Sequence, residues 1–120
     1  MRIASVSENL KLEKRIAISP EIAKKYISLG LEITLSESYG EHLGFKDNEF
    51  KELGVSFSNN PKEAISKADV IVQLGMPSED IIPLIKENQT LIGVMDPYNN
   101  KEKHLIFWKK SMHFLTLILI

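Results

Sequence analysis

Short apolar runs alternate along the chain with segments whose apolar residues recur at helical spacing. Six runs have the length and the apolar or β-branched content of strands. They are residues 2–6, 31–35, 55–57, 70–74, 91–94 and 114–120. The run 70–74 is almost wholly apolar, which is typical of a strand buried on both faces, so we expect it near the middle of a sheet.

The segment after the first strand carries clear helix signals. Ser19-Pro20-Glu21 supplies an N-cap, a proline at the first helical position and an acid in the first turn. The apolar residues of 20–29 fall on one helical face, and Gly30 suits a left-handed C-terminal cap. We therefore predict a helix that begins at residue 20 and ends just before Gly30.

Four further helices are predicted with weaker signals. Asp47 is expected to cap a short helix that Gly54 ends, and Asn60 to open another in which Glu63 completes a capping box. The other two are predicted from residues 78 to 84 and from 99 or 100 onward. Alternating strands and helices favour the α/β class, with a flavodoxin-like or Rossmann-like parallel sheet covered by helices on both faces.

The composition narrows the class of protein. The 120 residues are 43% hydrophobic and 26% charged, which suffices for one domain with a buried core. The 15 basic and 16 acidic residues are interspersed and give a net charge of -1, so nucleic acid is a poor candidate partner. Without cysteine there is no disulfide, thiolate metal site or thiol nucleophile. The first residues form a strand, with no secretory leader, which fits a cytoplasmic protein.

The last residues form an apolar run without a polar tail. A chain that stops within Leu117–Ile120 leaves an apolar strand at its terminus. We expect residues 1–120 to be one domain, truncated at the C-terminus. The alternative is a complete small domain whose last strand tucks into the sheet.

Arg15 is the most informative single residue. It lies between the first strand and the first helix, where ligands meet an α/β sheet. A guanidinium there can clamp a carboxylate or a phosphate with two hydrogen bonds. The alternative is an ion pair with a neighbouring loop.

Two more strands end at the same predicted edge. Gly75-Met76-Pro77 ends the central strand, and Asp96-Pro97 ends the next one. Asp96 can act as an acid or a base, but pairing with Arg15 or capping is the favoured interpretation. The carboxyl edge is therefore the expected ligand-binding edge.

Other familiar sites are not indicated. His42, His104 and His113 have no metal-ligand spacing, and no serine has the Gly-x-Ser-x-Gly frame of a hydrolase. Gly40 and Gly44 lack the pattern of a phosphate-binding loop and are expected to serve turns. No metal site is predicted.

Several motifs in register resemble the amino-terminal domain shared by alanine dehydrogenase and the α subunit of proton-translocating NAD(P) transhydrogenase. They are Met1-Arg2-Ile3-Ala4, Glu13-x-Arg15-Ile16-Ala17-x-x-Pro20, Leu29-Gly30-x-Glu32-Ile33, the segment 37–40 and Phe45-x-Asp47. The resemblance runs over nearly all 120 residues. The block around Arg15, taken together with the downstream glycines, is moderately specific.

The resemblance also shows where this chain departs from alanine dehydrogenases. Those enzymes carry a lysine shortly before the proline after the central strand and a histidine at the end of the following strand. Here the two places read Gln73-Leu74-Gly75-Met76-Pro77 and Asp96. Deamination needs an acid and a base, so alanine dehydrogenase activity is disfavoured. Arg15, Gln73 and Asp96 remain cleft candidates, and no catalytic residue is assigned.

By resemblance, the complete enzyme transfers hydride between NAD(H) and NADP(H) and couples this to proton translocation. The NAD(H)-binding Rossmann half is implied to lie beyond residue 120, so the chain alone is expected to be inactive and to bind no cofactor tightly. Implied partners are that half, the membrane-embedded and NADP(H)-binding subunits, and a second copy in a homodimer. The implied location is the cytoplasmic side of the inner membrane.

Two alternatives stay open. One is a fragment of an amino-acid dehydrogenase of the alanine or saccharopine type with a divergent pocket. The other is a non-catalytic flavodoxin-like interaction domain in which Arg15 only forms ion pairs.

Overall fold

The chain forms an α/β fold around one sheet. The computed structural model describes residues 1–8, 10–11, 14–75, 81–86, 88–93 and 113–116. The strands are β1 (Arg2–Ser5), β2 (Glu32–Ser36), β3 (Ser56–Ser58), β4 (Val70–Val72), β5 (Thr90–Gly93) and β6 (His113–Thr116). The helices are α1 (Pro20–Ser28), α2 (Asp47–Glu52) and α3 (Pro61–Lys67), with 3₁₀ turns η1 (Glu41–Leu43) and η2 (Ile82–Leu84).

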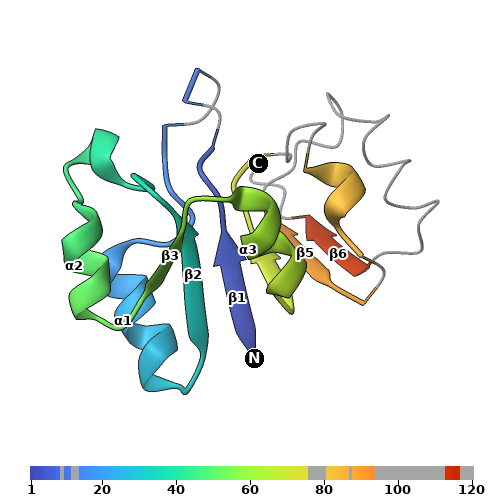
Figure 1. The fold of residues 1–120 in the computed structure, drawn as a ribbon, viewed down its shortest axis with the longest axis horizontal. Helices are drawn as coiled ribbons and strands as arrows, with labels where there is room; N and C mark the ends of the chain where they lie inside the picture. Colours follow the sequence, from blue (N-terminus) through green and yellow to red (C-terminus); the bar gives the residue numbers. More distant parts are fainter. Residues whose placement is uncertain (9, 12–13, 76–80, 87, 94–112, 117–120) are drawn as a thin grey trace.

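All six strands are parallel and lie in the order β3-β2-β1-β4-β5-β6 (Figure 1). Ile3 of β1 pairs with Ile33 on one side and with Val70 of β4 on the other. The chain thus builds outward from β1 to β3 and then returns to the other side of β1. This reversal makes the carboxyl ends of β1 and β4 the topological switch point of the sheet, where ligands bind in folds of this kind.

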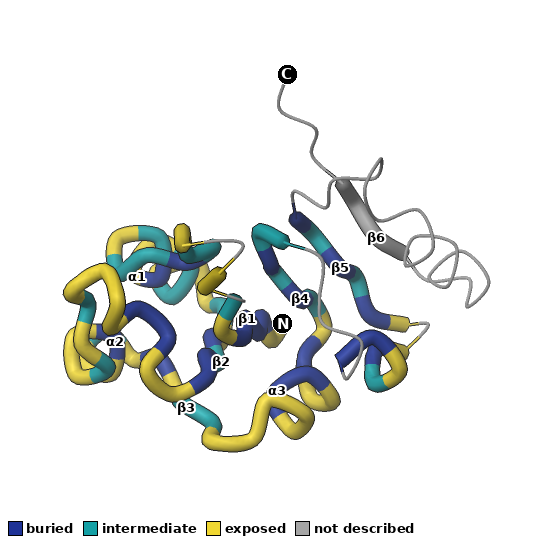
Figure 2. Tube along the Cα trace, turned by 90° about the horizontal axis from the view of Figure 1, so that it is seen from above, coloured by how far each residue is buried: buried dark blue, intermediate teal, exposed yellow. Residues whose placement is uncertain are grey.

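Two cores lie on opposite faces of the sheet, which confirms the predicted architecture. Neighbouring strand residues point to opposite faces, so Ile3 joins one core and Ala4 the other. The first core packs α1 and α2 on the sheet through Ala23 and Phe50. The second packs α3 through Ile65, and Figure 2 shows α3 on the side away from α1 and α2. Ile71 of β4 is fully buried, as expected for a central strand.

The predicted limits of α1 are confirmed. Ser19 is the N-cap, and its Oγ accepts a hydrogen bond from the Ile22 N–H at 3.3 Å. Gly30 has φ +85°, a left-handed conformation that glycine adopts without strain. The helix therefore begins and ends where the sequence places it.

Two predicted caps are wrong. Lys46, not Asp47, is the N-cap of α2 and makes no side-chain cap; Asp47 Oδ2 instead accepts the N–H of Ser38 at 3.0 Å. Ser38 has a positive φ of 59°, so the carboxylate supports a tight turn. In α3, Asn60 caps as predicted, but Glu63 pairs with Lys67 at 2.8 Å instead of closing a capping box.

The other differences concern the second half of the chain. Of the predicted helix 78–84, the structure describes residues 81–84, of which Ile82–Leu84 form η2, while residues 76–80 lie outside the described part. The helix predicted from residue 99 and the end of the last predicted strand, 117–120, also lie outside the described residues. Among the residues that the structure describes, no helix has the length and apolarity needed to cross a bilayer.

Candidate functional site

The carboxyl ends of β1 and β4 adjoin the loop that joins β1 to α1, which rises above the sheet in Figure 1. Arg15 is exposed in this loop. Gln73 follows β4 directly and is only 2% exposed. Asp96 lies outside the described residues, so its predicted pairing with Arg15 stays a prediction.

Gln73 joins β1 to β4 through its side-chain amide. Its Oε1 accepts hydrogen bonds from the Val6 N–H at 2.7 Å and from Ser5 Oγ at 3.2 Å. Its Nε2 donates to the Val6 carbonyl at 3.1 Å and to Glu8 Oε1 at 3.2 Å. These four contacts fix which end of the amide is oxygen, because each end meets only partners of the complementary kind.

Glu8 is a member of this site that the sequence analysis did not single out. Its carboxylate accepts hydrogen bonds from the backbone N–H groups of Leu74 at 2.6 Å and Gly75 at 3.4 Å. A Cβ at Gly75 would lie 3.4 Å from Glu8 Oε2, an ordinary van der Waals distance. The sequence did contain one signal for Glu8, because it is an acidic residue just beyond the first strand of a parallel sheet.

Tyr39, also missed by the sequence analysis, lies under the loop that carries Arg15. Its side chain is 1% exposed, and its Oη accepts the N–H groups of Ala17 at 3.1 Å and Ile18 at 3.2 Å. Both lone pairs are then used, so the phenolic proton points to Ser5 Oγ, 2.7 Å away. Ser5 in turn donates to Gln73 Oε1. The result is a directed chain of hydrogen bonds from the loop to the end of β4.

Burial raises the pKa of Tyr39 above its ordinary value of 10.0, because the phenolate would lose its solvation. The hydrogen bonds that Tyr39 makes with Ser5, Ile18 and Ala17 oppose the rise in pKa, and the negative charge of Glu8 adds to it. The phenol is therefore neutral across the physiological range and works as a fixed donor and acceptor.

This shift predicts a loss of stability in alkali. Above pH 10 the unfolded chain releases the Tyr39 proton while the folded chain retains it, so the free energy of unfolding falls as the pH rises. Denaturant unfolding between about pH 8 and pH 11 should show a shallower decline in Tyr39→Phe than in the wild type. Tyr26→Phe, in α1, is the matched control and should follow the wild type. Equal slopes for Tyr39→Phe and the wild type would contradict the assignment.

A dinucleotide pyrophosphate is bound by free backbone N–H groups beside a tight glycine turn. In the described part of this edge, six backbone N–H groups already donate to side chains of the chain itself. The pairs are Val6 with Gln73, Ser7 with Ser36, Leu74 and Gly75 with Glu8, and Ala17 and Ile18 with Tyr39. Among the described residues, no three His, Asp or Glu side chains are grouped closely enough to hold a metal ion.

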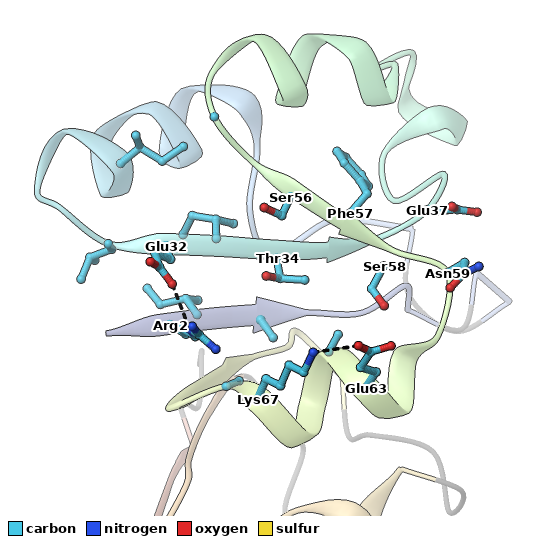
Figure 3. Close-up of a pocket in the computed structure, with 18 of the residues that line it drawn as sticks. Arg2, Glu32, Thr34, Glu37, Ser56, Phe57, Ser58, Asn59, Glu63 and Lys67 are labelled. Carbon is cyan, nitrogen blue, oxygen red and sulfur yellow. Dashed lines mark hydrogen bonds and ion pairs between the residues drawn. The ribbon is translucent and has the colours of Figure 1, made fainter.

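A separate hollow of about 960 Å³ lies on the sheet face beside α3 (Figure 3). The hydroxyls of Thr34, Ser56 and Ser58 line it. Four of its five charged side chains form two ion pairs, Arg2 with Glu32 at 2.9 Å and Lys67 with Glu63 at 2.8 Å, and Glu37 is the fifth. It lies away from the Gln73 network, so we place the candidate site at the carboxyl edge of the sheet.

Comparisons with known proteins agree with this architecture. The family described as alanine dehydrogenase/PNT, N-terminal domain matches residues 5–117. The first part of NAD(P) transhydrogenase subunit alpha from Rickettsia prowazekii (strain Madrid E) is 34% identical over 117 residues, which cover 93% of this chain and 30% of that protein. The corresponding protein from Rhodospirillum rubrum is 33% identical over 106 residues, covering 84% and 28%.

Solved structures show the same fold. The transhydrogenase from Sinorhizobium meliloti superposes with a TM-score of 0.87 at 25% identity, covering 97% of this chain and 34% of that one. An L-alanine dehydrogenase superposes with a TM-score of 0.88 at 18% identity, covering 97% and 32%. The chain thus spans about 30% of the length of the curated relatives it matches.

Proposed function

Because the chain belongs to the alanine dehydrogenase/PNT N-terminal domain family, we propose that it is the amino-terminal part of the α subunit of a proton-translocating NAD(P) transhydrogenase. In this proposal the complete enzyme transfers hydride between NAD(H) and NADP(H). Residues 1–120 contribute to the amino-terminal domain, and the NAD(H)-binding half belongs to another part of the subunit. The partners are that half, the membrane-embedded and NADP(H)-binding subunits, and a second copy in a dimer at the cytoplasmic face of the inner membrane.

The observation that carries the proposal is the engaged carboxyl edge. The backbone N–H groups beside Gln73 and Glu8 bind side chains of the chain itself, which suits a supporting wall better than a phosphate cradle. Gly75 also stands in the strand-end segment where the resemblance to alanine dehydrogenases implies a lysine. The edge thus offers hydrogen-bonded structure and Arg15, and the cofactor is left to the other half of the subunit.

Reconstitution tests this proposal. The chain is combined with the rest of the α subunit and with the NADP(H)-binding subunit, and reduction of an NAD analogue by NADPH is followed. We expect turnover from the combined parts and none from the chain alone. Alanine-dependent reduction of NAD⁺ would instead favour the alanine dehydrogenase alternative, and turnover by the chain alone would refute the role of a supporting half.

Arg15 is proposed as the cleft residue that faces the cofactor half. A charge-assisted hydrogen bond from a guanidinium contributes about 1.5–3 kcal/mol, so Arg15→Ala should lower kcat/KM for the dinucleotide roughly 10- to 100-fold. Arg2→Ala is the matched control, because Arg2 pairs with Glu32 at the opposite, amino end of the sheet. It should change kcat/KM less than about twofold. Equal effects of the two substitutions would remove Arg15 from the site.

A further inference from the structure

The segment from Tyr39 to His42 holds the backbone on both sides of Arg15. On one side, His42 Nε2 lies 2.7 Å from the Lys14 carbonyl oxygen. On the other, Tyr39 Oη accepts the N–H groups of Ala17 and Ile18. Arg15 therefore lies between two attachments that come from one short stretch after β2.

Each attachment has a defined direction. A carbonyl oxygen only accepts, so the His42 ring carries its proton on Nε2. Tyr39 accepts from the loop and donates to Ser5 Oγ, which ties it to the end of β1. Tyr39 is buried and cannot turn away without leaving the N–H groups of Ala17 and Ile18 without an acceptor, whereas the hydrogen bond between His42 and Lys14 lies at the exposed surface.

The holding segment is itself fixed. Gly40 caps the turn η1, and Gly44 ends it with φ +86°. A Cβ on Gly40 would lie 3.1 Å from the Phe45 Cβ and 3.5 Å from Ile16 Cδ1, so the segment packs directly against the residue that follows Arg15. Gly40, one of the two glycines predicted to serve a turn, thus also allows this close approach, whereas a Cβ on Gly44 would meet nothing within 4 Å.

We propose that Tyr39 and His42 are positioning residues that fix the direction in which the Arg15 guanidinium leaves its loop. This inference rests on the role proposed for Arg15. Two attachments restrain the backbone at residues 14, 17 and 18, which leaves the backbone of Arg15 little freedom. A guanidinium placed in this way loses less entropy when it binds a ligand oxygen.

The test is a double-mutant cycle in the reconstituted enzyme, with NADH as the varied substrate. Tyr39→Phe and His42→Ala should each raise KM about three- to tenfold, and His42→Gln, which keeps an N–H donor, should recover most of the loss. When Arg15 is already replaced by alanine, the same substitutions should raise KM by less than about twofold more. Full additivity with Arg15→Ala would overturn the inference. Tyr26→Phe is the control and should leave KM unchanged.

A second readout separates this inference from the proposed function. The Nε–Hε resonance of Arg15 in ¹⁵N-labelled protein should broaden or shift in Tyr39→Phe and His42→Ala, whatever Arg15 binds. If Arg15→Ala leaves turnover unchanged, the proposed role of Arg15 fails, and the resonance alone decides whether the segment positions it. An unchanged resonance in both variants would overturn the positioning role.

Discussion

Replacing Gln73 with leucine is expected to lower the free energy of unfolding by about 3–5 kcal/mol, among the largest effects for a single residue of this fold. The apolar side chain has a similar volume but leaves the Val6 N–H, the Val6 carbonyl and Ser5 Oγ without their present partner. These groups are buried at the carboxyl ends of the two central strands, β1 and β4, where water does not replace the lost hydrogen bonds. Urea unfolding followed by circular dichroism measures the loss.

Asn48→Leu is the matched control for the Gln73 substitution. It also exchanges an amide for an isobutyl group, but in an exposed position of α2. It should change the free energy of unfolding by less than about 0.5 kcal/mol. A loss below about 1 kcal/mol for Gln73→Leu would mean that the amide network contributes little to stability.

The sequence was sufficient for the fold because the patterns of α1 and β4 are local. Ser19, Pro20 and Gly30 mark the ends of α1 by their own conformational preferences, and the apolar run at β4 indicates burial on both faces. Asp47 was wrongly assigned because its partner, the N–H of Ser38, is supplied by a turn that no propensity predicts. Whether a side chain caps a helix depends on such competing partners, whereas the burial of a strand follows from its own apolar residues.

The site was only partly predictable for a related reason. Arg15 was singled out because the carboxyl edge of a parallel sheet follows from strand order, and Gln73 because it begins the segment where the resemblance to alanine dehydrogenases implies a lysine. Glu8 and Tyr39 were missed because their roles depend on contacts across 66 and 34 positions of sequence. Such contacts arise only when β1, β2 and β4 pair in register. Whether the Tyr39 hydroxyl donates or accepts each hydrogen bond also depends on these distant partners, so the sequence alone does not predict it.

Phe50→Ala should lower the free energy of unfolding by about 3–5 kcal/mol, because the ring is fully buried between α2 and the sheet. Its edge-to-face contacts with Tyr39 at 6.2 Å and with Phe57 at 6.0 Å are lost along with its buried area. Thermal or urea unfolding measures the change, with the exposed Leu29→Ala as control, expected within about 0.5 kcal/mol of the wild type.

The same substitution connects the core to the site. Phe50 supports the ring of Tyr39, so the cavity left by alanine gives Tyr39 room to move from the N–H groups of Ala17 and Ile18. Amide hydrogen exchange at residues 17 and 18 should therefore quicken more in Phe50→Ala than the loss of global stability requires. Leu29→Ala is the control and should leave the exchange rates at residues 17 and 18 unchanged. If exchange at residues 17 and 18 in Phe50→Ala changes only as much as the loss of global stability requires, Phe50 does not support the Arg15 loop through Tyr39.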